Sequence, residues 1–446
     1  MRARLKKALE VLSVSFWVVP GAITFAGICL AMALVYVDAS GALPAWLVNS
    51  AWLYNGGSTG ARTLLGAVAS STIGVAGTVF SITIAALSLA AGQMGPRLLR
   101  NFTKDRGNQI TLGAFLGTFS YSLMVLRTVR GEDEGAFVPH LSLTFGIILA
   151  FVCVGTLVYF VGHMAGRINV DTVVDLVSDD MRRTIDRLTV DERQPDQPTL
   201  SYWEGATAVT DGRRGYLQQL DTAGLASWAA ENDTSIRLLV RPGDYVFPGA
   251  PIALVKPMVE GVEEATRNAT ALGSQRGSSA DIEFAVRQLV EVAVRALSPG
   301  INDPLTAISV VDRLGAALCD LASCHLPTGV VLQEDRPVLI VPSVDYDGLV
   351  DTMFHMIRQN GSRSIAVLVR ILEVLTAVAS LEGRPDRIAT LRRHADLVLD
   401  DASRDIASPA DLNDIRRRHK GFLAMKEHGP LGHLEIMAFP KPDRTT

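Results

Sequence analysis

The stretch TLLGAVASSTIGVAGTVFSITIAALSLAAGQMGP occupies residues 63–96 and contains no charged side chain. The hydrocarbon core of a bilayer is spanned by about 20 apolar residues in a helix that rises 1.5 Å per residue. The stretch is longer than that, so it predicts a membrane-spanning helix that continues past the bilayer core. We expect the other segments of the chain to be organised around this helix.

Small side chains recur along this helix at alternating steps of four and three residues. They are Ala67, Ser71, Gly74, Thr78, Ser81, Ala85, Ser88 and Gly92. A repeat near 3.5 residues keeps them on one face, where small side chains let another helix approach closely. Two interpretations stay open: the face packs against a neighbouring helix, or it lines a water-filled path around a symmetry axis. The pore-lining candidates in the second case are Ser71, Gly74, Thr78, Ser81 and Ser88.

The composition indicates a membrane part and a soluble part. The chain has 446 residues, of which 48% are hydrophobic, and its mean hydropathy of +0.25 is high for a soluble protein. A net charge of −4 gives no sign of a nucleic-acid partner. The cysteines are scattered and form no disulfide framework, and we expect neither a metal site nor a cofactor. They are Cys29, Cys153, Cys319 and Cys324.

Three further apolar stretches, at residues 14–37, 110–129 and 138–162, predict three more spans. The third span carries Gly113 and Gly117, a pair suited to close helix packing. Basic residues precede the first span and follow the central and fourth spans, which predicts that both termini lie in the cytoplasm. We therefore expect a four-helix, multi-pass protein of the bacterial inner membrane.

Beyond the spans the pattern changes three times, which predicts domains at residues 1–163, 164–198, 199–260 and 261–446. Residues 170–188 continue a four-three apolar spacing that suits a helix bundle or an oligomer seam. A helix that ran on from the fourth span would couple the soluble part rigidly to the membrane. The run DERQPDQP at 191–198 ends this extension, because proline does not continue a helix.

Residues 199–260 predict short strands at 215–221, 235–240 and 252–255. Residues 241–244, RPGD, form a turn with proline second and glycine third, as type II geometry requires. The run GDYVFPGAPIALV at 243–255 resembles the half-barrels of biotinyl and lipoyl carrier domains. Those carriers hold their lysine at a hairpin apex, whereas Lys256 follows a strand. We therefore expect a small β-barrel-like module without a prosthetic group.

Residues 261–446 predict a mostly helical domain with one short strand at 337–342, so the soluble part is α+β. The run SPGINDP at 298–304 separates two predicted helices, and two interpretations of it stay open. Ser298, Asn302 and Asp303 form a ligand or ion site, or the run is a turn in which Asp303 caps a helix that starts with proline.

Two runs of sequence resemble a known family. RALSPGINDPLTA at 295–307 and QMGPRLLRNF at 93–102 are similar to the predicted bacterial membrane-protein family of unknown function DUF2254, and the resemblance covers nearly the whole chain. That family has no established activity, so the resemblance implies no site residue. In the second run, Gln93, Pro96, Arg97 and Arg100 form either an inner mouth with a cationic collar that selects anions, or a bend with positive-inside charges.

Two functions follow from these patterns. The first is a homo-oligomeric ion channel or channel-like conduit, lined by the central helix and gated by the cytoplasmic domain. The alternative is a membrane-anchored sensor, scaffold or assembly factor without transport. An enzyme is not expected, because the sequence has no phosphate loop, no HExxH and no nucleophile elbow. The expected partners are the lipid bilayer, further copies of the chain and inorganic ions.

Overall fold

The computed structural model describes residues 16–40, 54, 56–94, 105–131, 136–167, 170–274, 276 and 282–438. The chain divides into two compact units. The membrane unit contains the described residues up to 167, and the C-terminal unit contains those from 170 onward.

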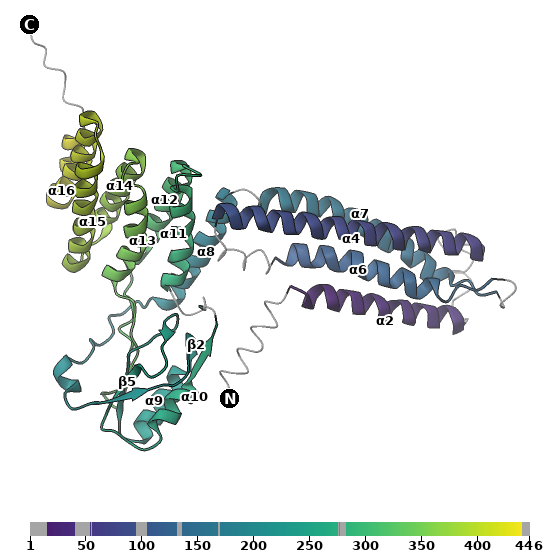
Figure 1. Ribbon diagram of the computed structural model, residues 1–446, viewed down its shortest axis with the longest axis horizontal. Coiled ribbons are helices and arrows are strands. Elements are labelled where there is room, and N and C mark those ends of the chain that lie inside the picture. The colour runs from purple at the N-terminus through teal and green to yellow at the C-terminus, as the bar shows by residue number, and fades with distance from the viewer. Residues whose placement is uncertain are drawn as a thin grey trace, which may run out of the picture. The chain divides into compact units, whose positions relative to one another are not determined.

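Among the described residues, four helices are long and apolar enough to cross a membrane. They are α2 (Val18–Ser40), α4 (Ser58–Met94), α6 (Arg106–Leu126) and α7 (His140–Arg167). The prediction of four apolar helices long enough to span a membrane is therefore confirmed. Helix α6 packs against all three of the others (Figure 1). More than half of the residues in its apolar segment are buried within the protein.

Helices α2 and α6 approach each other closely through glycines. A Cβ atom built on Gly27 would lie 2.6 Å from the carbonyl oxygen of Gly117, and one on Gly113 would lie 2.7 Å from Ile23 Cδ1. The contact at Gly27 is with backbone and requires glycine, whereas a larger residue at Gly113 would have to shift the end of the Ile23 side chain. The prediction that Gly113 and Gly117 form a close-packing pair is confirmed.

The last turn of α2 caps the first turn of α7. The carboxylate of Asp38 accepts hydrogen bonds from the Leu141 N–H at 3.1 Å, the Ser142 N–H at 2.9 Å and the Ser142 hydroxyl at 2.6 Å. Tyr121 of α6 donates its hydroxyl to the Ser142 carbonyl oxygen at 2.7 Å. A carboxylate on free N–H groups at a helix N-terminus is favourable, so three of the four helices are tied together at this end.

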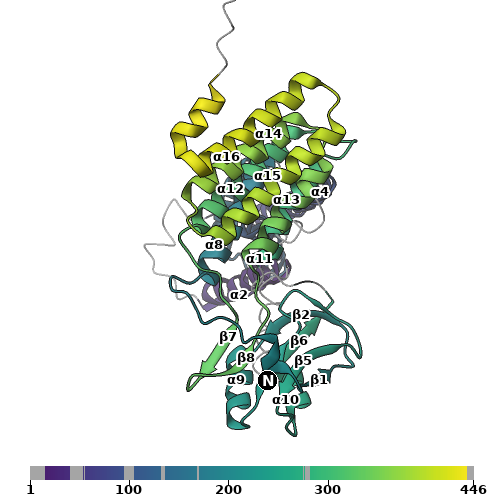
Figure 2. The same cartoon turned by 90° about the vertical axis from the view of Figure 1, so that its left-hand side faces the viewer.

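The first part of the C-terminal unit contains two open sheets and two helices (Figure 2). One sheet has the order β1-β5-β3-β8-β7 and the other β4-β2-β6. The strands are β1 (Thr207–Thr210), β2 (Gly215–Leu220), β3 (Ser235–Leu238), β4 (Tyr245–Val246), β5 (Pro251–Lys256), β6 (Thr270–Gly273), β7 (Val330–Gln333) and β8 (Arg336–Ile340). The helices are α9 (Thr222–Glu231) and α10 (Val262–Ala269). A short 3₁₀ helix, Leu200–Trp203, precedes them.

The expected β-barrel-like module is wrong, because the described strands close no barrel. Two features of the structure differ from the predicted barrel. Residues 222–231, predicted as part of a strand-and-turn region, form α9 behind an N-cap in which the Gly224 N–H donates to Asp221 at 3.1 Å. Strand β3 then pairs in parallel with β8, which follows it much later in the chain. The predicted turn at 241–244 is confirmed: Gly243 has φ +103°, and the Asp244 N–H donates to the Arg241 carbonyl.

The rest of the C-terminal unit is a stack of helices (Figures 1 and 2). They are α8 (Val170–Leu188), α11 (Ile282–Ala296), α12 (Pro304–Leu321), α13 (Tyr346–Asn360), α14 (Ile365–Leu381), α15 (Pro385–Asp405) and α16 (Pro409–Met437). Helix α8 buries Val174, Val177 and Met181 against α11 and α12 of the same chain. Its four-three spacing is therefore a bundle seam. Residues 168–169 lie outside the described part, so a rigid continuation from α7 stays a prediction.

A buried carboxylate joins the two parts of the C-terminal unit. Glu283 of α11 pairs with Arg241, which follows β3, at 2.5 Å and with Arg287 at 3.2 Å. Burial alone would raise the pKa of Glu283, but the charges and hydrogen bonds of these two arginines outweigh it and leave the pKa below its ordinary value. Glu283 therefore stays ionised and holds the strand end against the bundle.

Candidate functional site

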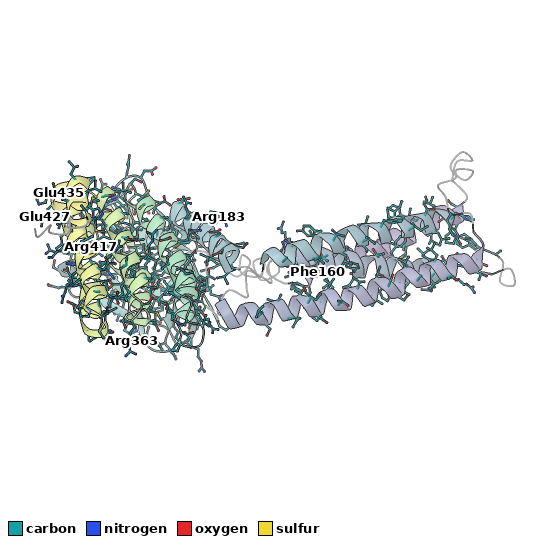
Figure 3. The ribbon with its side chains drawn as sticks, turned by 90° about the horizontal axis from the view of Figure 1, so that it is seen from above. Phe160, Arg183, Arg363, Arg417, Glu427 and Glu435 are labelled. Atoms are coloured by element: carbon teal, nitrogen blue, oxygen red, sulfur yellow. The ribbon has the colours of Figure 1, made fainter. Side chains whose placement is uncertain are left out.

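Helix α4 has one face packed inside the membrane unit. Its buried residues there are Ala61, Leu65, Ala69, Thr72, Ala76, Val79, Thr83 and Ala86. Part of this face lies in one apolar cluster with Leu112 and Phe115 of α6 and Phe160 of α7; Phe160 is labelled in Figure 3. The buried hydroxyls of Thr72 and Thr83 donate to carbonyl oxygens of α4 itself, at 2.7 and 2.8 Å. This packed face therefore presents an almost apolar surface to the bundle.

The predicted pore-lining candidates lie on the opposite side of α4. At about 100° per residue, a helix places them roughly half a turn away from the packed face. All five are exposed: Ser71, Gly74, Thr78, Ser81 and Ser88. No helix among the described residues of this chain covers them, so the small-residue face does not pack inside its own bundle. We call these residues the outer face of α4.

Large apolar side chains flank the outer face on both sides. Ile73, Phe80 and Ile84 form one ridge, and Ile82 and Leu89 form the other. Each is between 38% and 49% exposed. The outer face is thus a shallow polar strip between two apolar ridges. A strip of this kind can lie on a symmetry axis while the ridges contact neighbouring helices or lipid.

The hydroxyls of the outer face are held by the helix backbone. Ser71 donates to the Val68 carbonyl at 3.1 Å, Thr78 to Gly74 at 3.2 Å and Ser81 to Gly77 at 2.9 Å. A hydroxyl that donates its proton in this way keeps oxygen lone pairs that face outward. The face therefore presents oxygen acceptors, which are ligands for cations and hydrogen-bond partners for water.

The proposed inner mouth lies almost wholly outside the described residues. Gln93 belongs to the last turn of α4, but its side chain is outside the described part, as are Pro96, Arg97 and Arg100. The cationic collar therefore stays a prediction.

The proposed ligand turn is occupied by its own hydrogen bonds. Ser298 donates its hydroxyl to the Arg295 carbonyl at 2.6 Å, and the Asp303 carboxylate accepts from the N–H groups of Leu305 and Thr306 and from the Thr306 hydroxyl. The hydrogen bond from the Thr306 side chain is the largest cause of the lowered pKa of Asp303. Asn302 takes a left-handed φ of +49°. This geometry favours the capped turn between α11 and α12.

Asp105 and the polar side chains of α6 were not singled out by the sequence. Asp105 caps α6 through the Gly107 N–H, and its other oxygen lies 2.7 Å from His163 Nε2 of α7. Three buried atoms of α6 have no hydrogen-bond partner among the described residues: Asn108 Oδ1, Thr111 Oγ1 and Ser122 Oγ. A spacing search misses these three side chains because their apolar neighbours mask the pattern.

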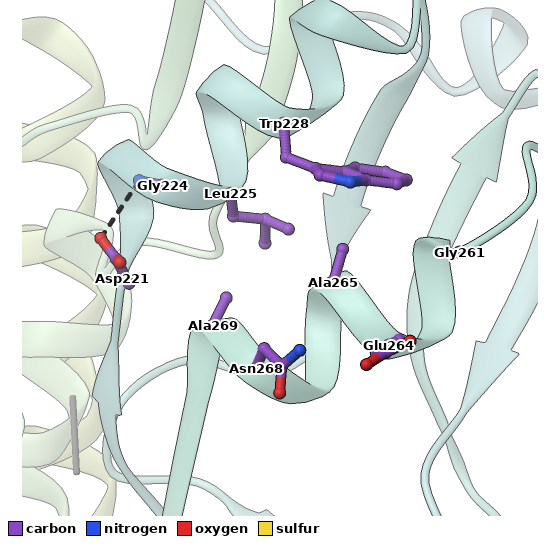
Figure 4. A pocket seen from close by; sticks show the side chains of 9 residues that line it. All are labelled: Asp221, Gly224, Leu225, Trp228, Gly261, Glu264, Ala265, Asn268 and Ala269. Atoms are coloured by element: carbon purple, nitrogen blue, oxygen red, sulfur yellow. Dashed lines mark hydrogen bonds between the residues drawn. The ribbon is translucent and has the colours of Figure 1, made fainter. Parts of the chain in front are cut away.

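A cleft lies between α9 and α10 in the C-terminal unit (Figure 4), with a volume of about 410 Å³. Trp228 and Leu225 project into it from α9, and Glu264 and Asn268 lie along α10. Asp221, the cap of α9, stands at its edge. The cleft therefore combines an aromatic side chain with two carboxylates.

Comparison with known proteins gives a family and uncharacterised relatives. The family described as "Predicted membrane protein (DUF2254)" matches residues 13–377. An uncharacterized protein of Mycobacterium tuberculosis strain CDC 1551 is 33% identical over 427 residues, which cover 92% of this chain and 80% of the relative. An uncharacterized protein of Mycobacterium bovis has the same identity and coverage. No solved structure matches this chain.

Proposed function

Because the chain belongs to the predicted membrane protein family DUF2254, we propose that it forms a homo-oligomeric ion conduit lined by the outer face of α4. The bilayer is the bacterial inner membrane, and both termini lie in the cytoplasm. The C-terminal unit gates the path, and the protein is not an enzyme.

The observation that carries this proposal is the exposure of a small, hydroxyl-bearing face on the longest of the four spans. In a bilayer, helices associate through small residues because these allow close backbone contact, and hydroxyls are favoured where they meet a partner or water. Within the described part of one chain, no other helix reaches Ser71, Thr78 or Ser81. Further copies arranged around the face would supply a helix contact or enclose water.

The alternative function, a membrane-anchored sensor, scaffold or assembly factor, uses the same face differently. There the outer face of α4 is a dry contact between subunits, and the flanking ridges seal it. The two functions differ in one measurable property, which is whether water reaches Ser81 in the assembled protein.

We would test this property by cysteine accessibility in liposomes. Single cysteines are placed along the outer face at Gly74, Thr78 and Ser81, and on the ridge at Ile84, in a chain whose native cysteines are replaced. A fifth variant, Ser122→Cys, reports on the polar interior of the bundle. A membrane-impermeant thiol reagent should modify the three outer-face positions and spare Ile84→Cys and Ser122→Cys.

Ion flux is measured on the same liposomes, for monovalent cations and anions separately. Ser81→Leu should abolish flux, because a branched side chain fills a narrow axial path, whereas Ile84→Leu on the ridge should leave it unchanged. Intact assembly of Ser81→Leu is checked by size-exclusion chromatography. Normal flux through assembled Ser81→Leu, or modification at Ser122→Cys alone, would refute the placement of the path on α4.

A further inference from the structure

Three potential metal ligands converge in the helical stack of the C-terminal unit. Asp351 and His355 lie one turn apart on α13, and His394 faces them from α15. His394 Nε2 lies 2.8 Å from Asp351 Oδ1, and His355 Nε2 lies 3.0 Å from the same oxygen. The three ligand atoms all lie within 4.8 Å of one another. His394 comes from a distant segment of the chain, so a search for ligands close in sequence does not find the three residues together.

These distances are near those of a zinc site. Zinc binds imidazole nitrogen and carboxylate oxygen at about 2.0–2.2 Å, which puts tetrahedral ligand atoms about 3.4 Å apart. The two distances to Asp351 are shorter than that by less than 1 Å.

His394 is the buried member of the three ligands. It is fully buried, and its Nδ1 atom has no hydrogen-bond partner among the described residues.

Two arginines border the cluster. Arg393 donates to Asp351 at 2.6 Å and to Asp347 at 2.8 Å, and Arg358 pairs with Asp401 while its Nη2 lies 3.4 Å from His355 Nδ1. A metal ion must displace Arg393 from Asp351. Arg393 is 38% exposed and keeps Asp347 as its partner, so the displacement leaves no buried charge unpaired.

We propose that Asp351, His355 and His394 bind one zinc ion that ties α13 to α15. Two imidazoles and one carboxylate favour zinc over magnesium or calcium, which prefer oxygen ligands. Asp351 and His355 are about one-third exposed, so a water molecule can complete the tetrahedron from the solvent side.

The test is zinc binding by the full-length protein in detergent, purified without a histidine tag. Isothermal titration with ZnCl₂ should show about one ion per chain, and MgCl₂ should show none. Removal of a residue that binds the metal directly lowers the affinity at least as much as removal of a residue that only supports a ligand. His355→Ala and Asp351→Asn should therefore weaken zinc binding at least about 10-fold. Both substitutions are at half-buried positions, and circular dichroism checks that the variants fold.

His419→Ala is the matched control. His419 Nε2 lies 2.7 Å from Asp396, so it forms a histidine–aspartate pair of the same kind, and no third ligand joins that pair in the described part of the chain. Its loss should leave zinc binding unchanged, and Arg393→Gln should bind zinc at least as tightly as the natural chain because the competitor for Asp351 is gone. Absence of zinc binding, or binding that is equal in the natural chain and in folded His355→Ala and Asp351→Asn, would overturn the proposal.

Discussion

Substitution of Gly27 by alanine should loosen the contact between α2 and α6. The new Cβ atom would lie 2.6 Å from the Gly117 carbonyl oxygen and 3.2 Å from the Gly117 Cα atom. Both are backbone atoms, so no side chain can rotate out of the way. The helices must separate locally, and the close contact around Ile23 and Gly113 would be lost with it.

The size of the effect follows from overpacking. Forcing an extra carbon into a packed contact costs about 1–3 kcal/mol, and glycine to alanine inside a helix gains about 1 kcal/mol by itself. Gly21→Ala, on the same helix, isolates the second effect, because a Cβ atom at Gly21 would have no atom within 4 Å. We therefore expect Gly27→Ala to be about 1–3 kcal/mol less stable than Gly21→Ala.

The assay is reversible unfolding in mixed micelles with increasing sodium dodecyl sulfate, followed by the change in far-ultraviolet circular dichroism. Gly117→Ala gives a graded comparison, since its Cβ atom would lie 3.2 Å from the Ile23 carbonyl oxygen, a less severe contact. We expect Gly21→Ala to be the most stable of the three variants, Gly117→Ala to be intermediate and Gly27→Ala to be the least stable. Equal stability of Gly27→Ala and Gly21→Ala, within about 0.5 kcal/mol, would refute the close contact between α2 and α6.

Two further predictions concern the C-terminal unit. Asp303→Ala removes the cap of α12 and should lower its thermal stability by the equivalent of about 1 kcal/mol, while Asn302→Gly, at a left-handed φ, should be nearly neutral in the same melt. The pKa of Glu283 is lowered in the folded protein, so its ion pairs stabilise the fold fully above the unfolded pKa of about 4.3 and lose this effect as pH falls through the folded value. As the pH is lowered from about 6 to about 3, the midpoint of thermal denaturation should therefore fall less steeply for Glu283→Gln than for the natural chain.

The membrane helices could be predicted from sequence because their signal is local. A span needs only a long apolar run, and the absence of charge from residue 63 to residue 96 supplies it. The close packing of Gly113 and Gly117 could also be predicted, since two glycines four residues apart share a helix face, but their partner helix α2 could not. The capped turn around Asp303 is likewise a local pattern of proline and aspartate.

The sheets and the metal cluster could not be predicted, because they depend on contacts between distant segments. Ile236 of β3 pairs with Leu339 of β8, and no spacing in either segment encodes that partner. Short strands around Gly243 look alike in a closed barrel and in an open sheet. His394 likewise meets Asp351 only because α13 and α15 pack together.

Two helices with the same four-three spacing have different surroundings, and the difference bears on function. Val174, Val177 and Met181 of α8 are large and apolar, and they are buried within their own chain. Gly74 and Ser81 of α4 are small, and every described helix of the membrane unit lies away from them. Lipid tails gain nothing from contact with serine or glycine in place of leucine, so an outer face of this composition suits a close helix or water better than lipid. This uncovered spacing on α4 is the basis of our proposal that further copies of the chain assemble around it, with the ridges around Phe80 and Leu89 as their contact surface.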